Sequence, residues 1–266
     1  FAFTTTATCD ADGNVLSEEE LAEYLAECEE NEVEPELTEK NVFTFQNILD
    51  VSKYSTVLVN SAWLALIATA ICLVIAYPLA YMISRMFYSR QKLALMLVML
   101  PMWMNFLLRT YAMMTLFENN GVLNSIFEWL GLPRQQMIGT EGAVLAGMVY
   151  NFLPFMVLPI YTVLKKLDSR VIEAAEDLGA NPIRVVTRVV LPLSVPGIVS
   201  GITMVFMPAV TTFAISRLMS SGMIYLMGDM IEEFYITMNN RNVGSAMSLV
   251  MMVLILISIG FLRKAD

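Results

Sequence analysis

Few residues of this chain could carry out chemistry, because the sequence contains no histidine and no G-x-x-x-x-G-K-[ST] phosphate-binding loop. Histidine is the side chain that most often serves as an acid, base or metal ligand near neutral pH. No nucleophile and base stand in a recognisable arrangement either. We therefore expect no catalytic site, no ATP bound through such a loop, no metal and no cofactor. The remaining candidates are charged and amide side chains, whose chemistry is ion pairing and hydrogen bonding.

Asp229 and Glu232 are the carboxylates whose spacing best suits a ligand. They stand at positions i and i+3, so a helix would place them one turn apart on the same face. Two carboxylates in that arrangement could together hold an ammonium group. The alternative, that they are solvated charges of a loop, stays open.

Polar residues inside apolar stretches form a second group, because such residues are costly in a membrane and therefore informative. Arg109 could extend toward the outer surface or line the outer mouth of a pathway, with Glu118 following it at that mouth. Asn105 and Asn151 could bond neighbouring helices or contact a substrate. The sequence alone leaves these alternatives open.

A mostly polar loop at residues 168–192 forms the third group. Gly179 predicts the left-handed residue that ends a first short helix, and Asn181 with Pro182 predicts the N-cap and first residue of a second. Pro192 is expected to end that second helix. The pattern therefore predicts a helix-turn-helix between two apolar segments.

The composition predicts that these groups are positioned by membrane-spanning helices, since 57% of the residues are hydrophobic and only 15% are charged. A hydrocarbon core about 30 Å thick requires ~20 apolar residues per helix. Five segments meet this requirement, at residues 56–83, 93–116, 142–164, 193–215 and 243–262.

The net charge of −9 is unevenly distributed, because residues 1–50 hold 14 acidic residues and one lysine. Ser17 and Glu20 predict a capping box at the start of an acidic helix, and Cys9 could pair with Cys28 on an oxidising side. Between the spans, ten basic residues fall on the side of the 168–192 loop and five on the other. The positive-inside rule therefore predicts a cytoplasmic 168–192 loop and C-terminus, with residues 1–55 outside.

The 168–192 loop resembles the EAA loop of permease subunits in binding-protein-dependent ABC importers. That pattern reads Glu-Ala-Ala, three residues, Gly, nine residues, Ile, one residue, Leu-Pro. Val189 replaces the isoleucine, and the other positions match, namely Glu173, Ala174, Ala175, Gly179, Leu191 and Pro192. The resemblance implies that these residues dock on a cytoplasmic ATPase. An ordinary helix hairpin is the alternative.

Further segments are similar to spermidine/putrescine permeases of the B-subunit type. They include Pro101, the stretch 109–112, Leu123-Asn124, the stretch 153–156 and Met227-Gly228. The resemblance implies an all-α polytopic membrane protein of the bacterial cell membrane, with the type I ABC importer permease fold. Relatives have six spans, so five here predict a first helix missing at the N-terminus, and the FAFTTT start would be its emerging end.

The partners that the resemblance implies are an ABC ATPase dimer, a second homologous permease and an extracytoplasmic polyamine-binding protein, within a lipid bilayer and without nucleic acid. The chain would comprise an acidic extracytoplasmic segment, residues 1–55, and a permease domain, residues 56–266. An ABC permease for sulfate, molybdate or iron is an alternative function, and a membrane channel is another. An anion route would require several basic residues in the outer halves of the spans, and Arg109 is the one found there.

Overall fold

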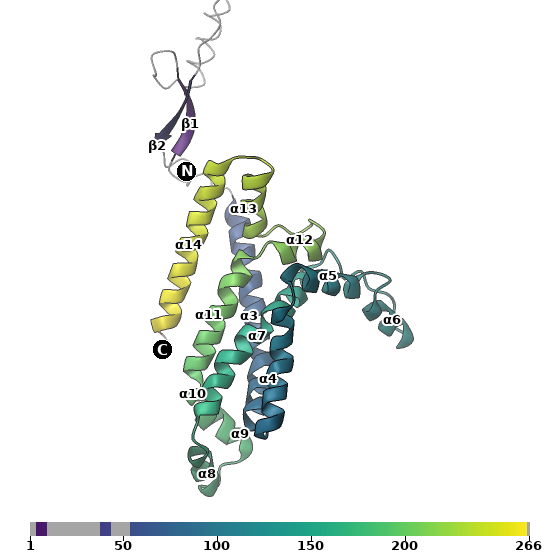
Figure 1. The fold of residues 1–266 in the computed structure, drawn as a ribbon, viewed down its shortest axis with the longest axis vertical. Coiled ribbons are helices and arrows are strands. Elements are labelled where there is room, and N and C mark those ends of the chain that lie inside the picture. The colour runs from purple at the N-terminus through teal and green to yellow at the C-terminus, as the bar shows by residue number, and fades with distance from the viewer. Residues whose placement is uncertain (1–3, 10–37, 44–53, 265–266) are drawn as a thin grey trace, which may run out of the picture. The chain divides into compact units, whose positions relative to one another are not determined.

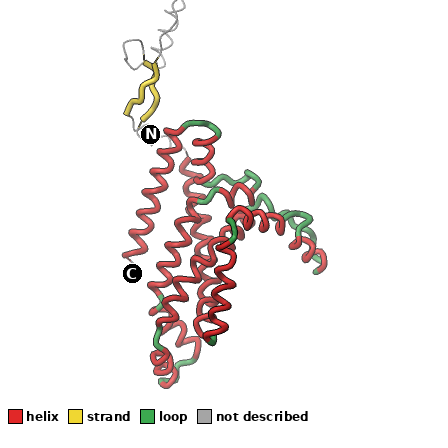
Figure 2. The backbone as a smooth tube through the Cα atoms, viewed as in Figure 1, coloured by secondary structure: helices red, strands yellow, loops and turns green. Residues whose placement is uncertain are grey.

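The computed structural model of the chain describes residues 4–9, 38–43 and 54–264. Two compact units are distinguished, one of residues 1–56 and 231–252 and the other of residues 57–230 and 253–266. Each unit is described by itself. The ribbon and the backbone trace show that helices make up nearly all of the described chain (Figure 1 and Figure 2).

The helices follow one another along the chain with short connections. Their bounds are α3 (Ser55–Arg85), α4 (Tyr88–Trp103), α5 (Phe106–Phe117), α6 (Val122–Trp129), α7 (Glu141–Lys166), α8 (Ser169–Asp177), α9 (Pro182–Val185), the π-helical turn η2 (Val186–Val190), α10 (Leu191–Leu193), α11 (Val195–Thr211), α12 (Ala214–Ser220), α13 (Met227–Ile236) and α14 (Arg241–Lys264).

Three helices, α3, α7 and α14, are long and apolar enough to cross a membrane by themselves. Two bent helix pairs meet the same test together, so the described residues provide up to five spans. The sequence predicted five, and the bounds of the first, third and fifth agree with the structure within about two residues. These helices confirm the predicted all-α architecture of this region, with up to five candidate spans.

The second span is not the continuous helix predicted at residues 93–116. Residues 88–103 and 106–129 form a pair bent by 97°. The break falls at Met104, whose backbone is extended with φ −78° and ψ 149°. Pro101 lies three residues earlier and cannot donate a helical hydrogen bond, and Asn105 caps the new helix α5, so both ends of the break are locally satisfied.

Pro192 does not end a helix, contrary to the expectation from the sequence. The chain stays helical through η2 and α10, and the bend of 67° falls between Leu193 and Val195. In η2 the N–H of Leu191 donates to the carbonyl of Val186, a bond one residue wider than in an α-helix. This wider turn lets the helix accommodate the proline ring.

Close packing of α7 against α11 forms the centre of the larger unit (Figure 1). A Cβ atom added at Gly201 of α11 would stand 2.7 Å from the sulfur of Met156 in α7, so a larger residue would require the methionine side chain to move. The buried face of α3 consists largely of small residues at helical spacing, Ser61, Ala65, Ala68, Cys72, Ala76 and Ala80. Small side chains let a helix lie close to its neighbours.

The smaller unit contains a strand pair that the sequence did not predict. Strand β1 (Thr4–Cys9) pairs antiparallel with β2 (Thr38–Phe43), with Thr4 opposite Phe43. The FAFTTT start is therefore not the end of a helix over Thr4–Thr6, because consecutive β-branched threonines favour extended backbone. The predicted acidic helix and Cys28 lie outside the described residues, and residues 1–55 as an extracytoplasmic segment stay a prediction.

Candidate functional site

The first helix of the 168–192 loop has defined caps at both ends. The Asp168 carboxylate accepts a hydrogen bond from the N–H of Arg170 at 3.0 Å and begins α8. At the other end the N–H of Gly179 donates to Glu176 O, and the N–H of Ala180 donates to Ala175 O. This pair of bonds is a Schellman motif and requires a left-handed residue. Gly179 supplies it with φ +80°, as predicted.

The second helix of the loop also begins as predicted. Asn181 is the N-cap of α9, and its side-chain oxygen accepts a hydrogen bond from the N–H of Arg184 at 2.8 Å. Pro182 occupies the first turn, where its missing N–H costs no helical bond. The loop is therefore a helix-turn-helix whose turn is fixed by the sequence.

Exposed apolar side chains flank the turn. Leu178, which ends α8, is 89% exposed, and Ile183 in α9 is 73% exposed. Glu173 and Ala174 are also exposed. Among the described residues no ion pair or hydrogen bond of the Glu173 side chain is found. The loop thus presents leucine, isoleucine and carboxylate side chains that are available to a partner.

Arg109 and Asn151 are brought together by the fold. Arg109 is only 6% exposed, and its Nε donates to Asn151 Oδ1 at 2.7 Å while its Nη1 donates to the carbonyl of Pro101 at 2.9 Å. The aromatic rings of Phe106 and Tyr150 lie 5.8 and 5.9 Å from the guanidinium. Arg109 therefore links α4, α5 and α7 beside the bend of the second span and does not extend to the surface.

Asn151 and Asn105 differ from each other in role. Asn151 is fully buried, and its amide nitrogen also donates to Gly147 O at 2.8 Å, so it forms the interhelical bond expected of it. Asn105 is exposed, and its side-chain oxygen accepts hydrogen bonds from the N–H groups of Leu107 and Leu108. It caps a helix and does not join two of them, because the bend places it at the start of α5.

Asp229 is buried, in contrast to a solvated loop charge. Its carboxylate accepts hydrogen bonds from the hydroxyl of Ser216 at 2.6 Å and from the N–H of Leu226 at 2.9 Å. In the second bond, Leu226, the residue before α13, donates its N–H to the side chain of Asp229, the third residue of the helix, as in a capping box. Asp229 therefore fixes the start of α13 and joins it to α12.

Glu118 and Glu232 lie in more open positions. Glu118 is exposed at the C-terminal end of α5, where the N–H of Gly121 donates to its carbonyl at 2.8 Å. Glu232 is half-buried and stands one turn after Asp229 in α13, at the predicted spacing. The division between the two compact units falls between Asp229 and Glu232.

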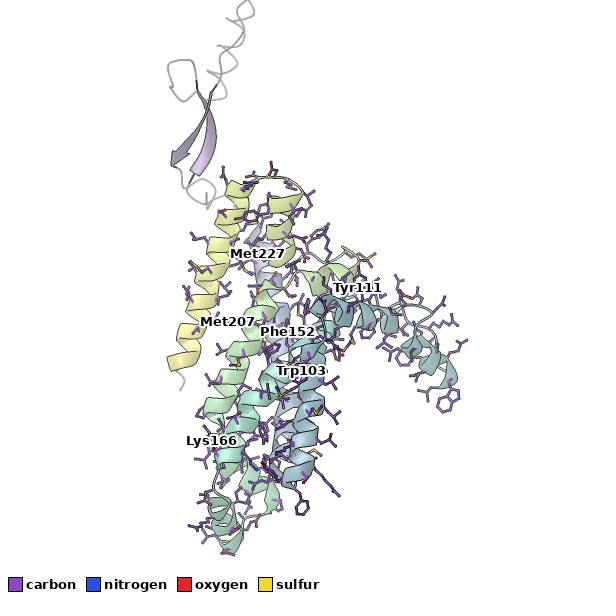
Figure 3. All side chains as sticks on the ribbon, viewed as in Figure 1. Trp103, Tyr111, Phe152, Lys166, Met207 and Met227 are labelled. Atoms are coloured by element: carbon purple, nitrogen blue, oxygen red, sulfur yellow. The ribbon has the colours of Figure 1, made fainter. Side chains whose placement is uncertain are left out.

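Four polar residues next to the 168–192 loop were not anticipated. They are Tyr77, Gln91, Lys165 and Ser194, and each forms a side-chain hydrogen bond to another helix. The sequence signal that could have indicated these contacts was the presence of polar residues, Gln91 and Ser194, at the ends of apolar segments. Figure 3 shows the end of α7 near the loop, marked by Lys166, and the end of α4, marked by Trp103.

The described chain is an apolar helical bundle with up to five candidate membrane spans, and it carries an exposed helix-turn-helix between two of them. Residues 43–265 match the model of the family described as "Binding-protein-dependent transport system inner membrane component". The chain belongs to this family.

Among curated relatives, the spermidine/putrescine transport system permease protein PotB of Haemophilus influenzae is 40% identical over 215 residues, which is 80% of this chain and 75% of the relative. PotB of Escherichia coli K12 is 37% identical over 220 residues, covering 80% of this chain and 79% of the relative. Both alignments include most of the permease region.

Solved ABC importers have the same fold. A chain of the bacterial alginate ABC transporter, solved with an alginate pentasaccharide-bound periplasmic protein, matches with a TM-score of 0.63 and 17% identity, covering 76% of this chain and 75% of that one. A chain of the MetNI methionine ABC transporter matches with a TM-score of 0.53 and 19% identity, covering 80% of this chain and 94% of that one. At these identities the likeness concerns the fold alone.

Proposed function

We propose that the chain is the transmembrane permease subunit of an ATP-driven importer of polyamines such as spermidine and putrescine. The observation that carries this proposal is the identity of 40% and 37% with two PotB permeases over 80% of the chain. The alternative anion routes would need basic residues along the pathway. Arg109 is buried and bonded to Asn151 and Pro101, so it is already engaged within the protein.

The chain would act with other subunits. We propose a dimer of cytoplasmic ATPases that hydrolyses ATP, a second homologous permease and an extracytoplasmic polyamine-binding protein. The excess of basic residues on the side of the 168–192 loop favours a cytoplasmic loop and C-terminus, with residues 1–55 outside a bacterial cell membrane. Closure of the ATPases would then move the loop and switch the spans between outward and inward access.

The 168–192 loop is the proposed contact with the ATPase. Its exposed Leu178 and Ile183 provide apolar area for burial, and Glu173 provides a charge for pairing. Gly179 fixes the angle between the two helices because its φ is +80°. Ala174, Ala175, Leu191 and Pro192 complete the contact by the pattern of the family.

Carboxylates are the proposed contacts for the cationic substrate. Glu118, Asp229 and Glu232 would attract and hold ammonium groups on the outer side, where acidic residues predominate. Asp229 has the further role of holding α12 and α13 together through Ser216. We assign Arg109 and Asn151 to maintaining the bend of the second span beside the pathway.

Co-purification tests the proposed assembly. The chain carries an affinity tag and is expressed with its chromosomal neighbours, and the proteins that accompany it from detergent are identified. We expect an ATPase, a second permease of the same family and, with spermidine present, a binding protein. Recovery of the chain alone from gently solubilised membranes would contradict the proposal and favour a channel.

A further inference from the structure

Both ends of the 168–192 loop are hydrogen-bonded to the same helical hairpin, formed by α3 and the start of α4. The first contact lies where α7 enters the loop, and the second lies where the loop continues into α11. Gln91 and Lys165 form the first contact, and Tyr77 and Ser194 form the second.

Gln91 forms the contact at the entry. It is 2% exposed, and its Oε1 accepts a hydrogen bond from Lys165 Nζ, in the last turn of α7, at 2.8 Å. Its Nε2 donates to the carbonyls of Ile83 and Ser84, near the end of α3, at 3.1 and 3.3 Å. An ammonium group only donates and carbonyls only accept, so the orientation of the amide is fixed by its partners. One side chain therefore joins α3, α4 and α7.

Tyr77 forms the contact at the exit. Its hydroxyl lies 3.1 Å from Oγ of Ser194, the fully buried residue at the 67° bend between α10 and α11. Ser194 donates its own hydrogen to Leu191 O at 2.9 Å, so the tyrosine is the donor to the serine. Tyr77 thus joins the middle of α3 to the end of the loop.

We propose that Gln91 and Tyr77 are positioning residues that transmit movement of the 168–192 loop to α3. The inference rests on the proposed function of the loop as the contact with an ATPase. A displaced loop moves the end of α7 and the α10–α11 bend, and these two contacts oblige the α3–α4 hairpin to follow. Without them, α7 and α11 could shift past α3, and ATP hydrolysis would continue with less transport.

The test measures spermidine uptake and ATP hydrolysis together in vesicles that contain the whole reconstituted importer. Tyr77→Phe removes one oxygen atom, and Gln91→Leu removes all three bonds of the amide at similar volume. We expect each variant to lower the spermidine transported per ATP at least about threefold, the factor expected for loss of one hydrogen bond. Gln91→Glu keeps an acceptor for Lys165 and should restore part of the ratio.

Matched controls lie next to each contact. Lys166→Met removes an exposed lysine one residue after Lys165, and Tyr81→Phe removes a hydroxyl one turn after Tyr77 in α3. Among the described residues, neither the hydroxyl group of Tyr81 nor the ammonium group of Lys166 forms a hydrogen bond. Both controls should keep the ratio of the unmodified importer.

The outcomes separate this inference from the proposed function. An unmodified importer that hydrolyses ATP without moving spermidine would contradict the function itself. An importer that transports spermidine, with an unchanged ratio in Tyr77→Phe and Gln91→Leu, would overturn the inference alone. Equal loss of uptake and hydrolysis would also overturn it, because that result indicates a structural role. If Gln91→Leu does not assemble, Tyr77→Phe alone decides.

Discussion

Arg109 Nε lies 2.7 Å from Asn151 Oδ1, so a buried guanidinium in α5 is hydrogen-bonded to a buried amide in α7. The same guanidinium also donates a hydrogen bond to the carbonyl of Pro101 in α4 at 2.9 Å. The buried side chain of Arg109 therefore bridges the two helices on either side of the 97° bend in the second span and joins them to α7. Because breaking hydrogen bonds between buried polar groups is costly, this arrangement constrains how α4 and α5 can move relative to α7.

Replacing Arg109 should destabilise the bundle. Arg109→Met leaves the buried amide oxygen of Asn151 without its donor, and an unsatisfied buried group costs about 1–3 kcal/mol. It also removes one of the two hydrogen bonds that the carbonyl of Pro101 accepts, the other coming from the N–H of Met104. We expect the free energy of unfolding in detergent micelles to fall by about 2 kcal/mol or more. Arg109→Lys should recover only part of the loss, since an ammonium lacks the planar fork that reaches both acceptors.

The exposed Arg134 provides the control for this substitution. It pairs with Glu128 at 2.9 Å, and the two side chains are 55% and 62% exposed. Surface pairs of this kind are worth about 0–1 kcal/mol. Arg134→Met should therefore leave the unfolding free energy nearly unchanged, and an equal effect of both substitutions would refute the special role of Arg109.

Gly179→Val should uncouple the importer without unfolding it. Nothing lies within 4 Å of an added Cβ atom, so the cost comes from the backbone, whose φ of +80° is unfavourable for a β-branched residue by about 1–2 kcal/mol or more. The strained turn would reorient α8 relative to α9. Transport-linked ATP hydrolysis in vesicles should be lost while membrane insertion is retained.

Gly179→Asn is the informative companion, because asparagine tolerates the left-handed conformation. This variant should keep most of the coupled activity. Full activity of the valine variant, or equal loss in both variants, would show that the backbone conformation of the turn is not what matters.

Leu178→Asp should weaken binding of the ATPase. Leu178 is 89% exposed, and placing a charge at a site that becomes buried against a partner costs as much as losing a hot-spot residue, about 2 kcal/mol or more. The amount of ATPase recovered with the tagged chain should fall about tenfold or more, and Glu173→Lys should act in the same direction. Leu132→Asp, also at an exposed leucine but outside the loop, should have no effect on recovery.

Removing the charges of Asp229 and Glu232 tests the proposed cation contacts. Asp229→Asn with Glu232→Gln keeps the size of both side chains, and we expect several-fold lower spermidine uptake with unchanged basal ATP hydrolysis. Glu233→Gln, the next residue of the same helix, should not change uptake. Uptake at the unmodified rate at both low and high salt would refute the pathway role and leave these acids as structural and surface charges.

Local sequence signals predicted the turn of the 168–192 loop and the caps beside it well. Gly179, Asn181 and Pro182 act within a few residues of their own positions, so their turn chemistry can be deduced without knowing the fold. The long apolar segments at α3, α7 and α14 were equally clear, because their length and composition are set by the thickness of the membrane.

The contacts between helices could not be deduced in the same way. The bend at Met104 is held by the bonds of Arg109 to Pro101 and to Asn151, and the bond to Asn151 exists only after α5 has packed against α7. The same is true of Gln91 with Lys165, which are 74 residues apart. The prediction that Pro192 ends a helix was wrong because the π-helical turn before it accommodates the proline ring. The pairing of Thr4 with Phe43 was not predicted because it depends on a partner strand distant in the sequence.

Uptake by reconstituted vesicles measures polyamine transport itself. The chain, reconstituted with its ATPase, partner permease and binding protein, is supplied with labelled spermidine or putrescine and with ATP on the ATPase side. We expect saturable, ATP-dependent accumulation that unlabelled polyamine reduces and sulfate does not. Accumulation that proceeds without ATP, or ATP-dependent accumulation of sulfate in place of spermidine, would show that the chain is not part of an ATP-driven polyamine importer.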